Sequence, residues 1–314
     1  MSTTASRRLK LVYQMKGSWV AVVTPFDSND NVDLGGFRTL VDFHAAHRTD
    51  GLVVMGSTGE ATMLSVEEKK LIAREVCEYA KGKIPVFVGT TCSTTRETVE
   101  VSKYAQDAGA DGILLIVPPY VRPPQDAIYE HFKTVAQAVS IPVALYNNPT
   151  RVGVNIDVQT VVKLAELDNV VADKEAMPNV QQIAEIKRQA GDKINVLCCD
   201  FPGYAIVIPT LALGGTGTAN VTGNIAPEEF ADMSKPWESY DDVVRSRELY
   251  FRLLPLMDAM YSLANPTPIK AALELLGLPA GKPRKPIPEL TGERLRKLDE
   301  LLTTMGIKEK YSVR

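Results

Sequence analysis

The sequence of 314 residues predicts an α/β fold, a (β/α)8 TIM barrel with additional C-terminal helices. Two observations predict this fold. Short apolar, β-branched runs recur at roughly thirty-residue spacing, and segments with helical periodicity and a charged face lie between most of them. Such alternation requires parallel strands joined by right-handed crossovers. A barrel of this kind takes about 250 residues in one domain, so the length fits one barrel with an addition.

The runs that we interpret as strands are mostly apolar on both faces, as expected where one face fills a barrel and the other packs under helices. They are residues 17–23, 51–56, 84–89, 112–117, 141–147, 169–174, 194–199 and 216–221. An open, doubly wound sheet would have similar strands. The count of eight, and the absence of a GxGxxG turn after the first strand, favour a closed barrel.

After the eighth run the pattern changes to helices only, with no low-complexity linker before them. We therefore predict an N-terminal tail (1–15), a (β/α)8 barrel core (16–226) and a C-terminal helical appendage packed on the barrel (227–314).

Composition excludes several classes of partner. The 35 Lys+Arg and 38 Asp+Glu give a net charge of -3, without the basic stripe of a nucleic-acid-binding protein. No apolar run approaches the roughly 18 residues of a membrane span, and the first residues do not resemble a signal peptide. We expect no nucleic-acid and no membrane partner, and a cytoplasmic location. The cysteines lack metal-ligand spacing and are expected to be reduced thiols: Cys77, Cys92, Cys198 and Cys199.

The candidate catalytic residue is Lys174, at the end of the sixth strand. Catalytic groups in these barrels lie at the carboxyl ends of strands. By the period of two, Val170, Ala172 and Lys174 share one face, while Val171 and Asp173 share the other. If the first face is the interior, Lys174 points an amine into the barrel mouth, where loss of hydration favours the free amine that attacks a carbonyl. The alternative is a strand-end lysine paired with a carboxylate.

Two further strand ends carry polar groups. After the fifth strand, Tyr146 offers a phenol for proton transfer, and Arg151 offers a guanidinium suited to a carboxylate. An interior tyrosine and a surface arginine are the alternative. After the second strand, GSTGE (56–60) brings glycines, which let backbone N–H groups approach a ligand, and two hydroxyls.

The GGTG segment (214–217) before the eighth strand leaves a rival open, because barrels often bind phosphate at that corner. Only three histidines are present, and none forms a metal-binding cluster with carboxylates. We expect no metal and no other cofactor.

Together, GSTGE, YNNPTRVG (146–153) and a lysine ending the sixth strand closely resemble the dihydrodipicolinate synthase / N-acetylneuraminate lyase family of class I aldolases. The resemblance runs from about Lys16 to the C-terminal helices and includes NPTPIK (265–270). It implies that Lys174 forms a Schiff base with pyruvate, that Tyr146 transfers protons and that Ser57 belongs to the proton relay.

The resemblance also implies a substrate-binding set. Thr58 would bind the pyruvate carboxylate, and Arg151 would hold the carboxylate of a second substrate, which favours a synthase joining pyruvate to aspartate semialdehyde for lysine biosynthesis. We place Gly56, Gly59 and Ala219 in the same set. The family further implies a homotetramer built as a dimer of dimers.

Three departures from the family keep alternatives open. Val121, after Tyr120, stands where synthases usually carry a second tyrosine that reaches the neighbouring subunit, Ser57 replaces a threonine, and Cys199 replaces a glycine. The alternative within the fold is an aldolase or dehydratase of a sugar-derived or hydroxylated 2-keto acid. A different class is a barrel without imine chemistry, either a sensor or a phosphate binder.

Overall fold

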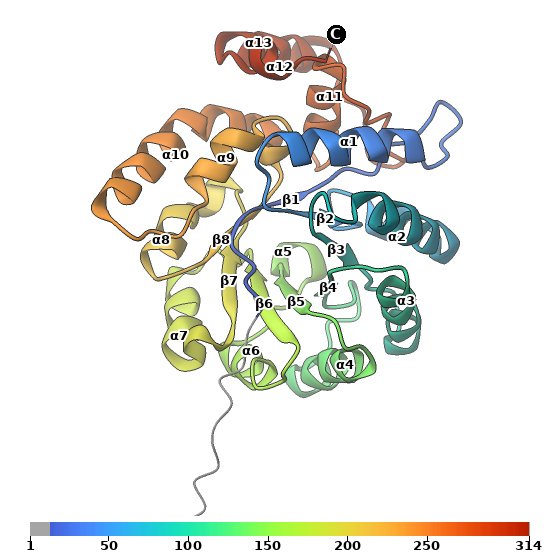
Figure 1. The fold of residues 1–314 in the computed structure, drawn as a ribbon, viewed down its shortest axis with the longest axis vertical. Coiled ribbons are helices and arrows are strands. Elements are labelled where there is room, and N and C mark those ends of the chain that lie inside the picture. Colours follow the sequence, from blue (N-terminus) through green and yellow to red (C-terminus); the bar gives the residue numbers. More distant parts are fainter. Residues whose placement is uncertain (1–12, 314) are drawn as a thin grey trace, which may run out of the picture.

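The computed structural model describes residues 13–313 and confirms the predicted fold class. Parallel strands pair in sequence order and β8 pairs with β1, so that the sheet closes into a barrel (Figure 1). The strands are β1 (Gly17–Ala21), β2 (Gly51–Val54), β3 (Val86–Gly89), β4 (Gly112–Ile116), β5 (Val143–Asn147), β6 (Val170–Glu175), β7 (Asn195–Cys198) and β8 (Gly217–Asn220).

Helices surround the barrel in the order that alternation predicts. They are α1 (Leu34–Ala46), α2 (Val66–Ala80), α3 (Thr95–Asp107), α4 (Gln125–Ala138), α5 (Pro149–Val152), α6 (Val158–Leu164), α7 (Val180–Ala190), α8 (Val207–Ala212), α9 (Pro227–Met233), α10 (Tyr240–Met260), α11 (Thr267–Leu275), α12 (Gly292–Thr304) and α13 (Ile307–Tyr311). Short 3-10 turns are η1 (Ala61–Met63), η2 (Gly191–Lys193), η3 (Pro202–Tyr204) and η4 (Thr222–Asn224). No helix in the described part of the chain is long and apolar enough to cross a bilayer.

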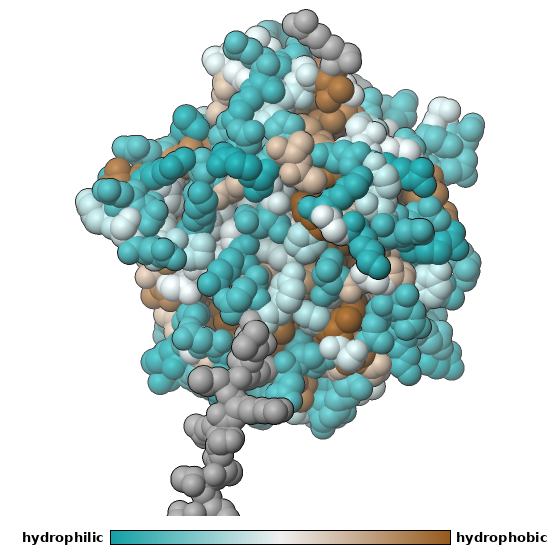
Figure 2. Space-filling view, in the orientation of Figure 1, coloured by the Kyte–Doolittle hydropathy of each residue, from teal (hydrophilic) through white to brown (hydrophobic). Residues whose placement is uncertain are grey.

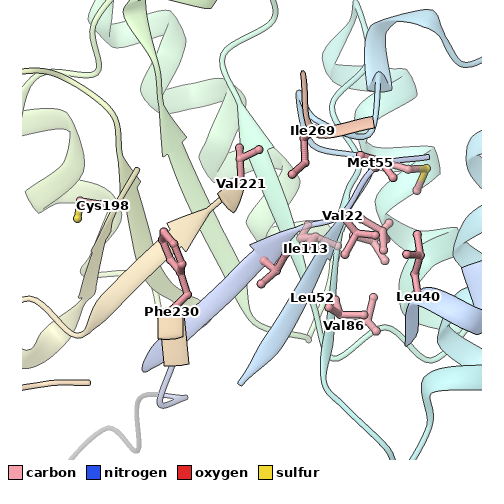
Figure 3. Close-up of a cluster of buried hydrophobic side chains, with 14 of the residues drawn as sticks. Val22, Leu40, Leu52, Met55, Val86, Ile113, Cys198, Val221, Phe230 and Ile269 are labelled. Carbon is pink, nitrogen blue, oxygen red and sulfur yellow. The ribbon is translucent and has the colours of Figure 1, made fainter. Parts of the chain in front are cut away.

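The core has two layers because successive strand residues face opposite sides of the sheet. The outer layer lies between strands and helices; Figure 3 shows Leu52 and Ile113 of the strands and Leu40 of α1 within it. The inner layer fills the barrel and includes Phe87 and Leu197. The interior is therefore a packed core, and ligands can enter only at its ends.

The last residues of the predicted tail pack on the barrel. Met15 is buried, and the ring of Tyr13 lies 5.6 Å from that of Phe87. The Asn195 side chain donates to the carbonyl of Tyr13 at 2.8 Å. Residues 1–12 of the predicted tail lie outside the described residues.

The helices after β8 extend the barrel on one side. Helix α9 packs against β1, and α10 packs against α8 and α9, whereas α12 and α13 form the outermost edge beyond α11 (Figure 1). On the face seen in Figure 2, hydrophilic side chains predominate and hydrophobic ones are scattered among them.

One prediction about β6 is wrong. Val170 belongs to the outer layer and Val171 to the inner one, the reverse of the predicted alternation. The cause is an irregularity in register: Val143 pairs with Val170, but the next residue of β5 pairs with Ala172. One extra residue in β6 shifts the alternation, so that Ala172 still faces the interior.

Candidate active site

A cavity of about 830 Å³ opens at the carboxyl ends of the strands. Gly56, Ser57, Tyr146, Arg151 and Asn265 line it. A larger hollow of about 1570 Å³ lies between the 281–290 segment and Phe26, and none of the predicted site residues lines it. The candidate site is therefore the smaller cavity, which is within the usual size range for small-molecule sites.

Lys174 and Tyr146 are neighbours on adjacent strands. They are register partners of β6 and β5, and the Lys174 Nζ lies 4.5 Å from the centre of the Tyr146 ring. Both side chains are about 5% exposed. None of the ion pairs within residues 13–313 includes Lys174, so its amine is not held by a carboxylate as the alternative required.

The GSTGE loop reaches the cavity and is tied to the C-terminal helices. Asn265 Nδ2 donates to the hydroxyl of Thr58 at 3.1 Å. Behind the loop, Glu60 and Lys270 of α11 form an ion pair at 2.7 Å in which both side chains are almost fully buried. Since Glu60 also accepts the backbone N–H of Arg284 at 2.8 Å, the loop cannot shift without breaking buried contacts.

Gly56 and Gly59 differ in what they do for this loop. A Cβ at Gly59 would lie 2.9 Å from the backbone nitrogen of Met55 and 3.2 Å from the carbonyl of Val22, so only glycine fits there. Gly56 has room around it and lines the cavity. Ala219 lies in the inner core layer, the same layer as Tyr146, and contributes a small side chain there.

Arg151 stands at the mouth of the cavity. It lies on α5, a single turn after β5, and its side chain is exposed. No ion pair among the described residues occupies its guanidinium, which is therefore available to a carboxylate entering from solvent.

Cys199 and Asp200 follow β7 beside the lysine. Asp200 accepts hydrogen bonds from the backbone of Val221 and Thr222, at 3.0 and 2.8 Å, and from the hydroxyl of Tyr261 at 2.6 Å. Burial and the nearby Asp200 raise the pKa of Tyr261 well above its usual value. Burial likewise raises the pKa of the Cys199 thiol, so this side chain is neutral in the site.

On the opposite face of β6, Asp173 and Glu175 are both buried. Asn147 and Gln182 donate to Glu175 at 2.9 to 3.1 Å, whereas neither oxygen of Asp173 has a partner among the described residues. Burial, and then the neighbouring Glu175, raise the pKa of Asp173 well above its usual value. Burial also raises the pKa of Glu175, to about 7, and its hydrogen-bond donors act against that rise. Glu175 is therefore the member of the pair that ionises first as the pH increases.

The glycine loop before β8 does not support the phosphate-binding rival. Residues 214–216 precede β8 and Gly217 begins it, so the loop lies at the amino end of the strands, opposite the cavity that Tyr146 lines. The glycines have a packing role, because a Cβ at Gly217 would lie 2.0 Å from the carbonyl oxygen of Gly17 on β1.

Tyr120 and Val121, after β4, are exposed by 95% and 62%. Within residues 13–313, no group of three or more His, Cys, Asp or Glu side chains could hold a metal ion.

Several residues around the site were not predicted from the sequence. Asn148 donates to the Tyr146 hydroxyl, Asn265 donates to Thr58, and Tyr204 contacts Thr150. The NPTPIK segment, which resembles the family, contains Asn265, but the sequence did not predict that Asn265 contacts Thr58. No sequence pattern predicted the role of Tyr204, because it lies after β7 and reaches Thr150 of α5 only in the folded structure.

Taken together, the site defines a class of protein: a barrel with an unpaired lysine beside a tyrosine at its carboxyl end, as in lysine-dependent aldolases. The model of the dihydrodipicolinate synthetase family matches residues 14–305. The chain therefore belongs to the dihydrodipicolinate synthetase family.

Individual relatives agree with this assignment. The chain is 41% identical over 279 residues to 4-hydroxy-tetrahydrodipicolinate synthase 1 of Halalkalibacterium halodurans, covering 89% of this chain and 93% of the relative. It is 38% identical over 293 residues to 4-hydroxy-tetrahydrodipicolinate synthase of Methanocaldococcus jannaschii, covering 93% and 99%. The crystal structure of dihydrodipicolinate synthase from Aquifex aeolicus superposes with a TM-score of 0.88 at 37% identity, covering 95% of this chain and 99% of that one.

Proposed function

We propose that the protein is a 4-hydroxy-tetrahydrodipicolinate synthase, which condenses pyruvate with aspartate semialdehyde through an imine on Lys174. The observation that carries the proposal is the buried Lys174, without an ion pair among the described residues, beside Tyr146, which lines a cavity together with Arg151. The names of the relatives support the choice of substrates.

The reaction begins when the Lys174 amine attacks the keto carbon of pyruvate. The resulting carbinolamine loses water, with Tyr146 donating the proton that the departing hydroxyl needs. Thr58 and the backbone N–H groups near Gly56 hold the pyruvate carboxylate. The hydrogen bond from Asn265 to the Thr58 oxygen leaves the Thr58 hydrogen free to donate to that carboxylate.

Loss of a methyl proton from the imine gives an enamine, which attacks the aldehyde carbon of the second substrate. Arg151 binds the carboxylate of that substrate at the mouth, so that the aldehyde points inward. Cyclisation then releases the product and frees the lysine. The imine is itself the electron sink, and the mechanism needs no further cofactor.

The enzyme is proposed to be a cytoplasmic homotetramer built as a dimer of dimers. The cysteines that the structure describes are free and buried, which suits a reducing compartment. The exposed Tyr120 and Val121 offer apolar surface for a contact between subunits. Light scattering of the purified protein measures the assembly directly.

Borohydride reduction with pyruvate, followed by intact mass and peptide mapping, tests the imine. A pyruvate-sized adduct on Lys174, absent from Lys174→Ala, is expected; native, folded protein without an adduct would refute the mechanism. Feeding aspartate semialdehyde and hydroxylated sugar-derived aldehydes to the pyruvate-loaded enzyme then tests the second substrate. Faster turnover of a sugar-derived aldehyde would favour the sugar-acid aldolase instead.

A further inference from the structure

A continuous chain of hydrogen bonds runs from the surface to the Tyr146 hydroxyl. The hydroxyls of Tyr204 and Thr150 lie 3.1 Å apart, Thr150 donates to Asn148 Oδ1 at 2.7 Å, and Asn148 Nδ2 donates to the Tyr146 hydroxyl at 2.8 Å. Asn148 is 6% exposed, whereas Thr150 lies at the exposed mouth. This chain of hydrogen bonds therefore joins η3, α5 and the end of β5.

Every hydrogen bond in this series is donated in the same direction, from Tyr204 towards Tyr146. A threonine hydroxyl has one hydrogen, and that of Thr150 goes to Asn148, so the bond between Tyr204 and Thr150 must be donated by Tyr204. Burial raises the pKa of Tyr204, which keeps its hydrogen in place for this bond. The amide of Asn148 accepts on its oxygen and donates on its nitrogen, so it passes the direction on to Tyr146.

The consequence falls on the hydrogen of Tyr146. Because an amide N–H can only donate, Asn148 occupies a lone pair of the Tyr146 oxygen and cannot accept its hydrogen. That hydrogen is left for the cavity, which Tyr146 lines beside Lys174. None of the hydrogen bonds within residues 13–313 joins Ser57, the predicted relay residue, to Tyr146.

We propose that Asn148, Thr150 and Tyr204 are positioning residues that hold the Tyr146 hydroxyl with its hydrogen directed at the hydroxyl that leaves the carbinolamine of pyruvate and Lys174. This inference rests on the proposed function, because it assigns a direction to the proton transfer in that reaction. Aligned bonds polarise one another, so each donor strengthens the next. The orientation is present before substrate binds, and no hydroxyl has to rotate during carbinolamine dehydration.

The residues at the outer end of the chain can be changed with little effect on packing. Phe201 supports the Tyr204 ring with centroids 4.6 Å apart, and Tyr204→Phe keeps that ring contact. Thr150→Val keeps the shape of the side chain and removes its donor, whereas Thr150→Ser keeps the donor. Asn148→Asp keeps the shape but has no hydrogen to donate, so the Tyr146 hydrogen turns away from the cavity towards it.

The experiment measures how fast the borohydride-trappable pyruvate adduct forms, its final amount, and kcat and KM for pyruvate. Thr150→Val is expected to slow adduct formation and kcat by about tenfold, Tyr204→Phe by about threefold and Asn148→Asp by about a hundredfold, within the range of general acid catalysis. The final amount of adduct and KM stay near native values, and Thr150→Ser restores the rate. Tyr240→Phe, on exposed α10, is the matched control without effect.

Two outcomes overturn the inference while the proposed function stands: Thr150→Val and Asn148→Asp form adduct at the native rate, or Thr150→Ser is as slow as Thr150→Val, which would mean that shape rather than the donor matters. Native protein that forms no adduct would overturn the proposed function, and the inference with it.

Discussion

The buried Asp173 gives the sharpest test of the electrostatics around β6. Its side chain is 0% exposed and neither oxygen has a hydrogen-bond partner among the described residues. Glu175 beside it accepts hydrogen bonds from Asn147 and Gln182, and burial raises its pKa to about 7, so it ionises before Asp173 does. Asp173 is therefore expected to be a neutral acid in the folded protein, and Asp173→Asn replaces it with a neutral side chain of the same shape.

The pH dependence follows from the direction of the pKa shift. The pKa of Asp173 is raised in the folded state, whereas an aspartate in the unfolded chain titrates near about 3.9. Its contribution to stability is fully present below the unfolded pKa and is lost as the pH rises through the folded pKa. The loss is about 1.4 kcal/mol for each pH unit between the unfolded and the folded pKa.

Urea unfolding of native protein and Asp173→Asn at several pH values measures this loss. The amide of Asp173→Asn is buried without a hydrogen-bond partner, which destabilises the variant by about 1 to 3 kcal/mol at every pH. The test is therefore how the difference in unfolding free energy between variant and native protein changes with pH, and not its size at one pH. The stability of the variant relative to native protein is expected to rise with pH. A difference that stays flat or falls would show that Asp173 is ionised and stabilised in the fold. Asp107→Asn, at an exposed position on α3, is the matched control.

Three further predictions concern the site and its support. Lys174→Ala is expected to reduce turnover to background and to change the free energy of unfolding in urea by no more than about 1 kcal/mol, since the lysine makes no ion pair within residues 13–313; a steady-state assay that retains activity would contradict its role. Arg151→Ala is expected to lower kcat/KM for aspartate semialdehyde about 10- to 100-fold, from the loss of a charge-assisted hydrogen bond, and to leave KM for pyruvate unchanged; Arg151→Lys tests whether charge suffices. Lys270→Met is expected to destabilise the fold by about 3 to 5 kcal/mol in urea unfolding, because it leaves Glu60 buried and unpaired. Adding Glu60→Gln to Lys270→Met should recover part of that loss, because it removes the unpaired charge. A double variant no more stable than Lys270→Met would show that the ion pair between Glu60 and Lys270 is not the cause of the loss.

The sequence by itself determined the fold class and the position of the lysine. Eight apolar runs alternating with helical segments specify a parallel barrel, since each run must be buried on both faces. A lysine ending such a run must lie at the carboxyl end of the barrel, as Lys174 does. The GSTGE and YNNPTRVG segments were placed in the site on the same reasoning, and the structure brings Ser57, Tyr146 and Arg151 to one cavity.

Only the tertiary structure decided the register and the contacts between distant segments. The extra residue in β6 reversed the predicted faces of Val170 and Val171, because pairing with β5, and not local periodicity, sets which side a residue faces. The contacts of Asn265 with Thr58 and of Tyr204 with Thr150 join residues 207 and 54 positions apart. Closure of the barrel creates such contacts, since it brings the ends of all strands to one face whatever their separation in the chain.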